Sequence, residues 1–246
     1  MGCGRQAALA TRLLRARGSK VVQILDPRLD PRHWDIVVVP EHDRLRGPNV
    51  LTLLGSLHPI DDAWLAAGRA AFPALGALPS PRIGLLVGGP SGLAPWSEAQ
   101  AHTAFADIAA QLRTHGGSIL ASASRRTPPA VAAALRRTFA DVPGMVWCGA
   151  DDGANPYAGL LGWAERLACT PDSVNLLSEA CATRVPVQVL IPETARDRAL
   201  AFHRALQARG RLLPAENAGD APATGIEPLR ETARVAALIR NCLALA

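Results

Sequence analysis

Short runs of β-branched and aliphatic residues alternate with alanine-rich segments of helical periodicity along almost the whole chain. This alternation is typical of parallel strands joined by crossover helices, because a tight turn cannot connect two parallel strands. The chain has 246 residues, of which 49% are hydrophobic, so one or two domains can each bury a core. The sequence therefore predicts an α/β fold.

A proline-punctuated stretch near Pro79 interrupts the alternation in the way that an interdomain linker does. It divides the chain into an N-terminal lobe (1–78), a larger lobe (79–225) and a closing C-terminal helix (226–246), and both lobes have the element order of Rossmann-like domains. The predicted strands cover residues 20–25, 35–39, 50–53, 82–87, 118–122, 145–148, 166–169 and 187–191. The predicted helices before the closing one cover residues 7–17, 61–71, 97–114, 128–139, 156–164, 172–183 and 197–209.

The start of the first lobe departs from this plan, because the chain enters a helix directly after Met1-Gly-Cys-Gly4. Doubly wound sheets normally begin with a central strand. A missing strand would leave neighbouring backbone groups unpaired inside the sheet, at a cost of about 1–3 kcal/mol for each buried group. We therefore expect the first lobe to lack its first strand, with an upstream start of the natural protein or another element filling the gap.

The charge pattern limits the classes of partner. No apolar stretch approaches the roughly 20 residues of a membrane-spanning helix, and no secretory signal is recognisable, so we expect a cytoplasmic protein. Aromatic residues make up 4% of the chain, which disfavours a stacking surface for nucleic acid. The net charge of +5 leaves peripheral contact with an anionic membrane open, through a face near Arg12, Arg15 and Arg17.

Several catalytic motifs are absent from the sequence. The single lysine, Lys20, follows no glycine loop, so a P-loop is excluded, and neither a dinucleotide-binding GxGxxG nor a GxSxG elbow is present. The five cysteines lie at long, irregular spacings and the acidic residues are dispersed. We therefore expect no metal site and no cofactor.

Candidate phosphate-binding groups follow two predicted strands of the larger lobe. Gly88 and Gly89 come directly after the strand at 82–87, and glycines there allow backbone amides to approach a phosphate. A tight turn explains the same two glycines. After the next strand the candidates are hydroxyl and guanidinium groups that precede a helix, where an anion would be favoured. They are Ser122, Ser124, Arg125, Arg126 and Thr127, for which an ordinary helix cap with solvated arginines is the alternative.

A third candidate is the helix predicted from Asp172 onward. Asp172 and Ser173 begin this helix, and Ser178 and Glu179 follow within two turns. Glu179 lies among leucine, alanine and cysteine residues, an environment in which a carboxylate needs an explanation. It could hold the hydroxyls of a ribose while the start of the helix faces the diphosphate.

Four separated segments resemble one family. The segments Val39-Pro-Glu-His-Asp43, Ser122-Ala-Ser-Arg-Arg-Thr-Pro128, Asn155-Pro-Tyr157 and Thr170-Pro-Asp-Ser-Val-Asn-Leu-Leu-Ser-Glu-Ala180 are similar to the elongated-mitochondria (mitochondrial fission) family and its bacterial branch. That family is similar to GT-B glycosyltransferases. The resemblance implies two Rossmann-like lobes in a GT-B-like arrangement, and it assigns the ribose to Glu179 and the phosphates to the loops before it.

Two functions follow from this resemblance. In the first, the larger lobe binds a nucleoside diphosphate sugar and transfers the sugar to an unknown acceptor without a metal ion, while Arg125 and Arg126 offset the charge of the leaving group. His42, Asp43 and His58 are then the candidate bases, with turn and capping roles as the alternative that the sequence favours. In the second, the chain is a non-catalytic nucleotide-binding or scaffold protein.

Overall fold

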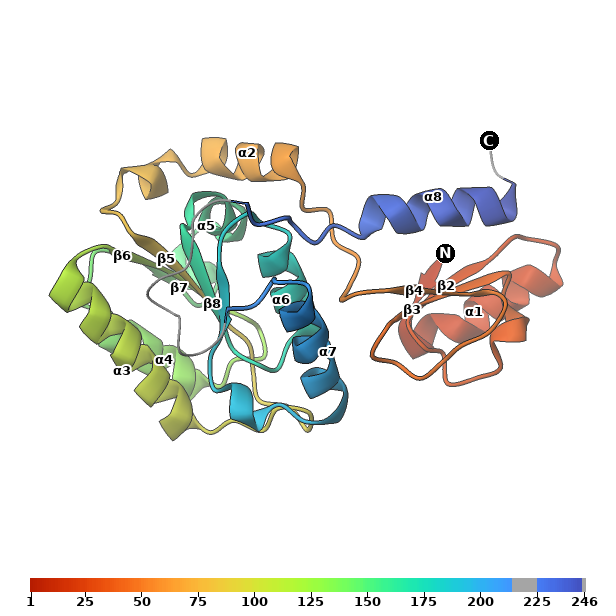
Figure 1. The fold of residues 1–246 in the computed structure, drawn as a ribbon, viewed down its shortest axis with the longest axis horizontal. Coiled ribbons are helices and arrows are strands. Elements are labelled where there is room, and N and C mark those ends of the chain that lie inside the picture. The colour runs from red at the N-terminus through yellow and green to blue at the C-terminus, as the bar shows by residue number, and fades with distance from the viewer. Residues whose placement is uncertain (214–224, 245–246) are drawn as a thin grey trace. The chain divides into compact units, whose positions relative to one another are not determined.

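The computed structural model describes residues 1–213 and 225–244 and divides the chain into two compact units (Figure 1). The first unit combines Met1–Leu57 with Arg230–Ala246, and the second runs from His58 to Leu229. Residues 214–224, near the end of the predicted larger lobe, lie outside the described residues, and so do the last two residues of the predicted closing helix. Within the described ranges, no helix is long and apolar enough to cross a bilayer.

The first unit contains a parallel four-stranded sheet with one helix on each face (Figure 1). Its strands, in spatial order, are β1 (Gly2–Cys3), β2 (Val22–Ile24), β3 (Ile36–Pro40) and β4 (Val50–Leu53). Its helices are α1 (Gly4–Ala16), a short 3₁₀ turn (Pro31–His33) and α8 (Thr232–Leu243). Val37 and Val39 of β3 pack with α1, whereas Ile36 and Val38 pack with α8. Successive side chains of the fully buried strand β3 point to opposite faces of the sheet, so this strand contributes to the core on both faces.

A strand of two residues, β1, precedes α1, where the sequence predicts none. Its residues pair in parallel with Gln23 and Ile24 of β2. The buried side chain of Gln23 donates to the backbone oxygen of Gly4 over 2.8 Å and accepts a hydrogen bond from Thr11 over 3.1 Å. A side-chain amide therefore satisfies polar groups next to this short strand, and this pairing cannot be read from hydrophobic periodicity.

The second unit contains a five-stranded parallel sheet in the order β7-β6-β5-β8-β9. The strands are β5 (Arg82–Val87), β6 (Ser118–Ala123), β7 (Gly144–Trp147), β8 (Arg166–Cys169) and β9 (Val187–Val189). The helices are α2 (Asp62–Ala71), α3 (Glu98–His115), α4 (Pro129–Thr138), α5 (Tyr157–Trp163), α6 (Val174–Cys181) and α7 (Asp197–Ala208), with 3₁₀ turns at Pro73–Ala77, Ala150–Asp152 and Pro192–Thr194. The strands β6 and β7 follow on one side of β5, and β8 and β9 are then added on its other side. The sheet therefore has its topological switch point between β5 and β8.

The boundary between the units lies at Leu57 and His58, earlier than the predicted position near Pro79, because α2 docks on α5. A Cβ atom added to Gly68 of α2 would lie 2.4 Å from the backbone oxygen of Ala158 in α5, so the two helices approach closely. The closing helix, predicted as a separate element, completes the core of the first unit as α8. Both differences come from packing between segments that are distant in the sequence.

Candidate functional site

Two loops meet at the switch point, one after β5 and one after β8. The backbone N–H of Gly88 donates to Oγ1 of Thr170 over 2.8 Å, and the N–H of Gly89 donates to Oδ2 of Asp172 over 3.0 Å. Open α/β sheets bind their ligands at the carboxyl ends of the strands beside such a point. The sequence-predicted residues Gly88, Gly89 and Asp172 are therefore brought together at the position where this fold places a ligand.

The two glycines are required by packing. A Cβ atom on Gly88 would lie 2.2 Å from Oδ2 of Asp172, and one on Gly89 would lie 2.1 Å from the backbone oxygen of Arg126. Their N–H groups, which the sequence assigned to a phosphate, already have partners in Thr170 and Asp172. An anion at this edge of the sheet would therefore bind other groups around the glycine loop. It would reach the two N–H groups only if it displaced Thr170 or Asp172.

The loops after β5, β6 and β8 together form a loop cluster, and the Asp172 carboxylate lies at its centre. Its side chain is fully buried, with 0% exposure. Besides Gly89, it accepts a hydrogen bond from the indole N–H of Trp96 over 3.0 Å and from the guanidinium of Arg126 over 3.2 Å. A buried carboxylate needs several donors to offset its lost hydration. Asp172 therefore joins three segments of the unit, and both of its oxygens accept hydrogen bonds from protein donors.

The loop after β6 supplies the third part of the cluster. The hydroxyl of Thr127 is shared between the backbone oxygens of Val87, at 2.9 Å, and Gly88, at 2.6 Å, and it accepts from the backbone N–H of Ser124. Arg126 is half exposed while it contacts Asp172, and Arg125 is exposed. The two guanidiniums are thus cations of this loop that face the solvent.

Ser122 takes no part in the loop. It lies inside β6, between Leu86 and Trp147 in the strand ladder, and it is buried. Its predicted place among the phosphate-binding residues therefore has no support in the geometry.

The helix that follows β8 begins at its predicted cap. The side chain of Ser173 accepts a hydrogen bond from the backbone N–H of Leu176 over 3.3 Å, which identifies Ser173 as the N-cap of α6. The hydroxyl of Ser178 donates to the backbone oxygen of Val174 over 2.7 Å, and Ser178 is buried. Both serines thus have structural roles, while the first turn of α6 follows directly on the Asp172 loop.

Glu179 forms a hydrogen-bonded pair with Tyr157, the first residue of α5. The phenol donates to Oε2 of Glu179 over 2.5 Å. Burial raises the pKa of the Glu179 carboxyl above its ordinary value, and the hydrogen bond from Tyr157 opposes that rise. Burial also raises the pKa of Tyr157 well above its usual range, and the neighbouring carboxylate adds to this shift. Tyr157 therefore stays protonated, holds one carboxylate oxygen and leaves Oε1 for a further donor.

The glutamate of this pair lies on α6, and the N-cap of that helix, Ser173, directly follows Asp172 of the loop cluster. Burial raises the pKa of the Cys169 thiol well above its usual range, and the neighbouring Cys181, Asp172 and Glu179 raise it further. Tyr157, Trp96 and Thr170 were not predicted as site residues. Tyr157 carried one usable signal, because it is the single tyrosine of the chain and belongs to the Asn-Pro-Tyr segment.

The predicted bases fall in different units. His42 and Asp43 follow β3 in the first unit, and Asp43 is buried in a turn in which its backbone N–H donates to the oxygen of Pro40 over 3.0 Å. His58 begins the second unit and is also buried. The turn that contains His42 and Asp43 fits the alternative interpretation of these two residues. The predicted role of all three residues as bases stays a prediction.

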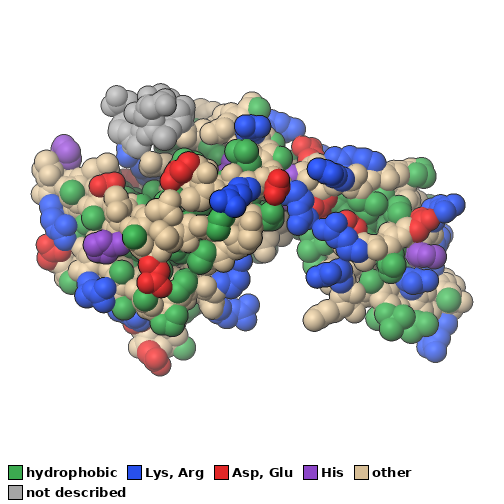
Figure 2. All heavy atoms as spheres, turned by 90° about the horizontal axis from the view of Figure 1, so that it is seen from below, with side chains coloured by type: hydrophobic (Ala, Val, Ile, Leu, Met, Phe, Trp, Pro, Cys, Tyr) green, Lys and Arg blue, Asp and Glu red, His purple; other side chains and the backbone are tan. Residues whose placement is uncertain are grey.

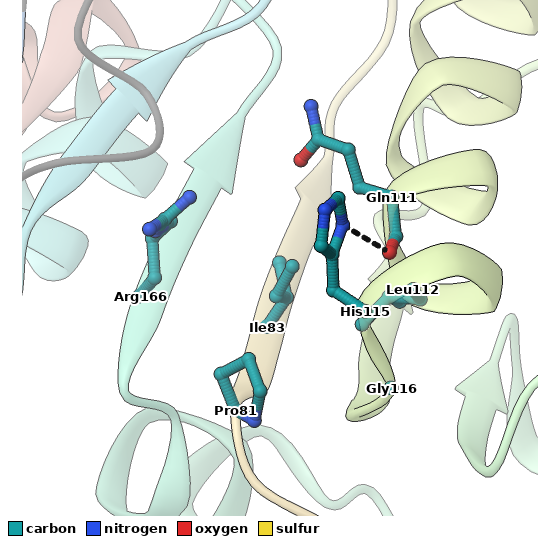
Figure 3. A pocket seen from close by; sticks show the side chains of 7 residues that line it. All are labelled: Pro81, Ile83, Gln111, Leu112, His115, Gly116 and Arg166. Atoms are coloured by element: carbon teal, nitrogen blue, oxygen red, sulfur yellow. Dashed lines mark hydrogen bonds between the residues drawn. The ribbon is translucent and has the colours of Figure 1, made fainter.

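A hollow at the opposite edge of the second sheet is separate from this cluster (Figure 3). It is lined by Pro81 and Ile83 at the beginning of β5, by Arg166 at the beginning of β8, and by Gln111 and His115 near the end of α3. These residues lie at the amino ends of the strands, where this fold class does not usually bind ligands. Nowhere in residues 1–213 and 225–244 do three His, Cys, Asp or Glu side chains gather as a metal site would require.

Comparison with solved structures supports the fold. The S. aureus MnaA–UDP co-structure matches 100% of this chain and 74% of its own chain with a TM-score of 0.58 at 10% identity. The UDP-GlcNAc 2-epimerase from Neisseria meningitidis, bound to UDP-GlcNAc, matches 98% of this chain and 73% of its own chain with a TM-score of 0.55 at 13% identity. The predicted GT-B-like α/β fold class is confirmed.

Comparison with other sequences identifies the family. The mitochondrial fission protein ELM1 of Arabidopsis thaliana is 29% identical to this chain over 280 residues, which cover 99% of the chain and 63% of the Arabidopsis protein. The sequence profile described as "Mitochondrial fission ELM1" matches residues 1–243. The chain belongs to the mitochondrial fission ELM1 family.

Proposed function

We propose that the second unit binds a nucleoside diphosphate sugar at the carboxyl edge of its sheet, between β5 and β8. The observation that carries this proposal is the Tyr157–Glu179 pair, whose glutamate lies on α6, the helix that follows the switch-point loop after β8. A half-buried carboxylate there, with one oxygen held and the other left for a donor, is suited to the hydroxyls of a ribose. Support also comes from the two solved structures of the same fold, which hold UDP and UDP-GlcNAc.

The phosphates would be held by the groups around the glycine loop. Because the N–H groups of Gly88 and Gly89 are engaged, we assign the diphosphate to the exposed guanidiniums of Arg125 and Arg126 and to the first turn of α6. Arginine binds phosphate through paired, charge-assisted hydrogen bonds, and the N-terminus of a helix favours an anion. Arg126 would exchange its contact with Asp172 for the ligand, and its half-exposed position permits this movement.

Transfer of the sugar is the enzymatic form of the proposal. The arginines would offset the negative charge that develops on the departing diphosphate, which is electrostatic stabilisation without a covalent intermediate. His42, Asp43 and His58 are the predicted bases for an acceptor hydroxyl. A non-catalytic scaffold is the second candidate, and membership of a family described by its part in mitochondrial fission favours it.

Isothermal titration calorimetry tests the binding step. UDP, ADP, GDP and UDP-GlcNAc are titrated into the wild-type chain and into Glu179→Ala, and Asp107→Ala, an exposed carboxylate on α3, serves as the control. We expect at least one nucleotide to bind the wild type and the control equally, and Glu179→Ala to weaken it about tenfold or more, the value of one hydrogen bond to a charged group. Absence of binding to the wild type, or equal affinity in all three proteins, would refute the proposal.

A product assay separates the two candidates. Release of the free nucleoside diphosphate from UDP-GlcNAc is followed in the presence of candidate acceptors, with Glu179→Ala as the control. Turnover that this substitution abolishes would identify a transferase. Nucleotide binding without turnover would favour the scaffold.

A further inference from the structure

The exposed hydrophobic side chains of the chain are gathered in one region. Within the described residues, every large hydrophobic side chain that is exposed belongs to the first 29 residues: Met1, Leu9, Leu13, Leu14, Leu25 and Leu29. A single exposed leucine is ordinary on a protein surface, but a group of them indicates an interaction surface. Three of the six lie on α1.

The packing of α1 holds these leucines on its outer side. Ala8 and Thr11 face the sheet and are buried. The hydroxyl of Thr11 accepts a hydrogen bond from the indole N–H of Trp34 over 2.8 Å and donates to Gln23, which fixes the rotation of the helix. Leu9 and Leu13 therefore point outward, one helical turn apart, with exposures of 66% and 55%.

Positive charge flanks the exposed leucines. Arg5 precedes Leu9 by one turn, Arg17 follows Leu13 by one turn, and both arginines are exposed. The first 25 residues contain no aspartate or glutamate. Figure 2 shows Lys and Arg side chains spread over the surface of the first unit, on the right of the view, with hydrophobic side chains among them.

One predicted cation does not belong to this surface. Arg15 lies 3.5 Å from Asp35 in an ion pair and also donates to the backbone oxygen of Arg32. The arginine-bearing face inferred from the sequence therefore shifts around the helix, away from Arg15 and toward the leucines. We define the α1 outer face as Arg5, Leu9, Leu13, Leu14 and Arg17.

We propose that the α1 outer face binds the surface of an anionic membrane. An interfacial helix combines exposed leucines, which enter the boundary of the acyl chains, with cations that meet lipid phosphates, and the α1 outer face has both. A second copy of the chain is a poorer partner, because a symmetric contact through this face would bring arginines against arginines. An anionic lipid surface complements both the charge and the apolar side chains.

Vesicle co-sedimentation tests the proposal independently of nucleotide binding. The wild-type chain is mixed with vesicles of phosphatidylcholine and phosphatidylglycerol and with vesicles of phosphatidylcholine alone, at low and high salt. We expect binding to the anionic vesicles that falls as salt rises, because exposed charges are screened. We expect the double variant Leu9→Ser/Leu13→Ser to bind at least about tenfold less well, because two leucines lose their apolar contact.

The charge is tested with matched variants. Arg5→Gln/Arg17→Gln removes two charges from the α1 outer face. Arg204→Gln/Arg209→Gln removes two exposed charges from α7 and its C-cap in the second unit. We expect about a tenfold loss or more at low salt for the first pair and little change for the second. Circular dichroism establishes that each variant is folded.

Three results would overturn the proposal. They are no binding of the wild type to anionic vesicles, binding that neither the leucine nor the arginine variant weakens, and equal losses in the α1 and α7 arginine variants. Light scattering tests whether a second copy of the chain, instead of a membrane, covers the α1 outer face. A wild-type dimer that Leu9→Ser/Leu13→Ser converts to a monomer, without vesicle binding, would assign the face to a second copy.

Discussion

Replacing Asp172 by asparagine should destabilise the second unit substantially while leaving its shape almost unchanged. In the wild type, Oδ1 accepts from Trp96, and Oδ2 accepts from both Gly89 and Arg126. An asparagine has one oxygen and one NH₂ group, so in either orientation its NH₂ faces a buried donor. If the oxygen serves Gly89 and Arg126, the indole N–H of Trp96 loses its acceptor.

The expected cost follows from these contacts. A hydrogen bond to a charged acceptor contributes about 1.5–3 kcal/mol, and a buried donor without a partner costs about 1–3 kcal/mol. Removing the burial cost of the charge offsets part of this loss, because Asp172 is fully buried. We expect the free energy of unfolding to fall by about 3 kcal/mol.

Urea unfolding, followed by tryptophan fluorescence and circular dichroism, measures this change. Asp151→Asn is the matched control, because Asp151 is exposed in the turn after β7. The control should lie within about 0.5 kcal/mol of the wild type. If both variants unfold at the same urea concentration as the wild type, Asp172 is not the centre of the loop cluster.

Three further substitutions test the packing and the charges of the second unit. Gly89→Ala should destabilise it by about 2 kcal/mol because the new Cβ meets a backbone oxygen, whereas Gly92→Ala, in open space, should change the urea midpoint little. Gly68→Ala should lower that midpoint although alanine favours helices by about 1 kcal/mol; a rise would show that α2 does not dock on α5. Since burial raises the pKa of Glu179 in the folded state, that state takes up the proton first, and stability rises as the pH falls through this pKa. Tyr157→Phe removes the opposing hydrogen bond, so its deficit against the wild type in urea titrations should be largest above the pKa and should shrink below it.

Local sequence patterns predicted the strands better than the division into units. The strands Val50–Leu53, Arg82–Val87 and Arg166–Cys169 have the predicted bounds. In the last two, burial on both faces leaves a continuous apolar signal. The place of α2 depends instead on the contact between Gly68 and Ala158, which are ninety residues apart in number. The sequence of a helix with one apolar face does not show which unit that face packs against. Contacts with distant segments therefore decide the unit to which α2 belongs.

The same limit applies to the candidate site. The sequence correctly placed Gly88, Gly89 and Asp172 at strand ends that converge, because parallel strands end at one edge of a sheet. It did not show that Asp172 and Thr170 take the N–H groups of the glycines, because these bonds join β5 to the loop after β8. Only the three-dimensional pairing shows that these glycines are needed to make room for protein atoms.

Nucleotide binding and membrane binding can be tested against each other, because their residues lie in different units. If the two sites are independent, Arg5→Gln/Arg17→Gln leaves the dissociation constant of the nucleotide unchanged, and Glu179→Ala leaves vesicle binding unchanged. If vesicles change the nucleotide affinity by some factor, thermodynamic linkage requires the nucleotide to change the vesicle affinity by the same factor. Calorimetry with and without anionic vesicles, and co-sedimentation with and without UDP, measure the two factors. Unequal factors would mean that the two assays do not report equilibrium binding to the same folded chain, because two ligands on one chain must obey this reciprocity wherever they bind.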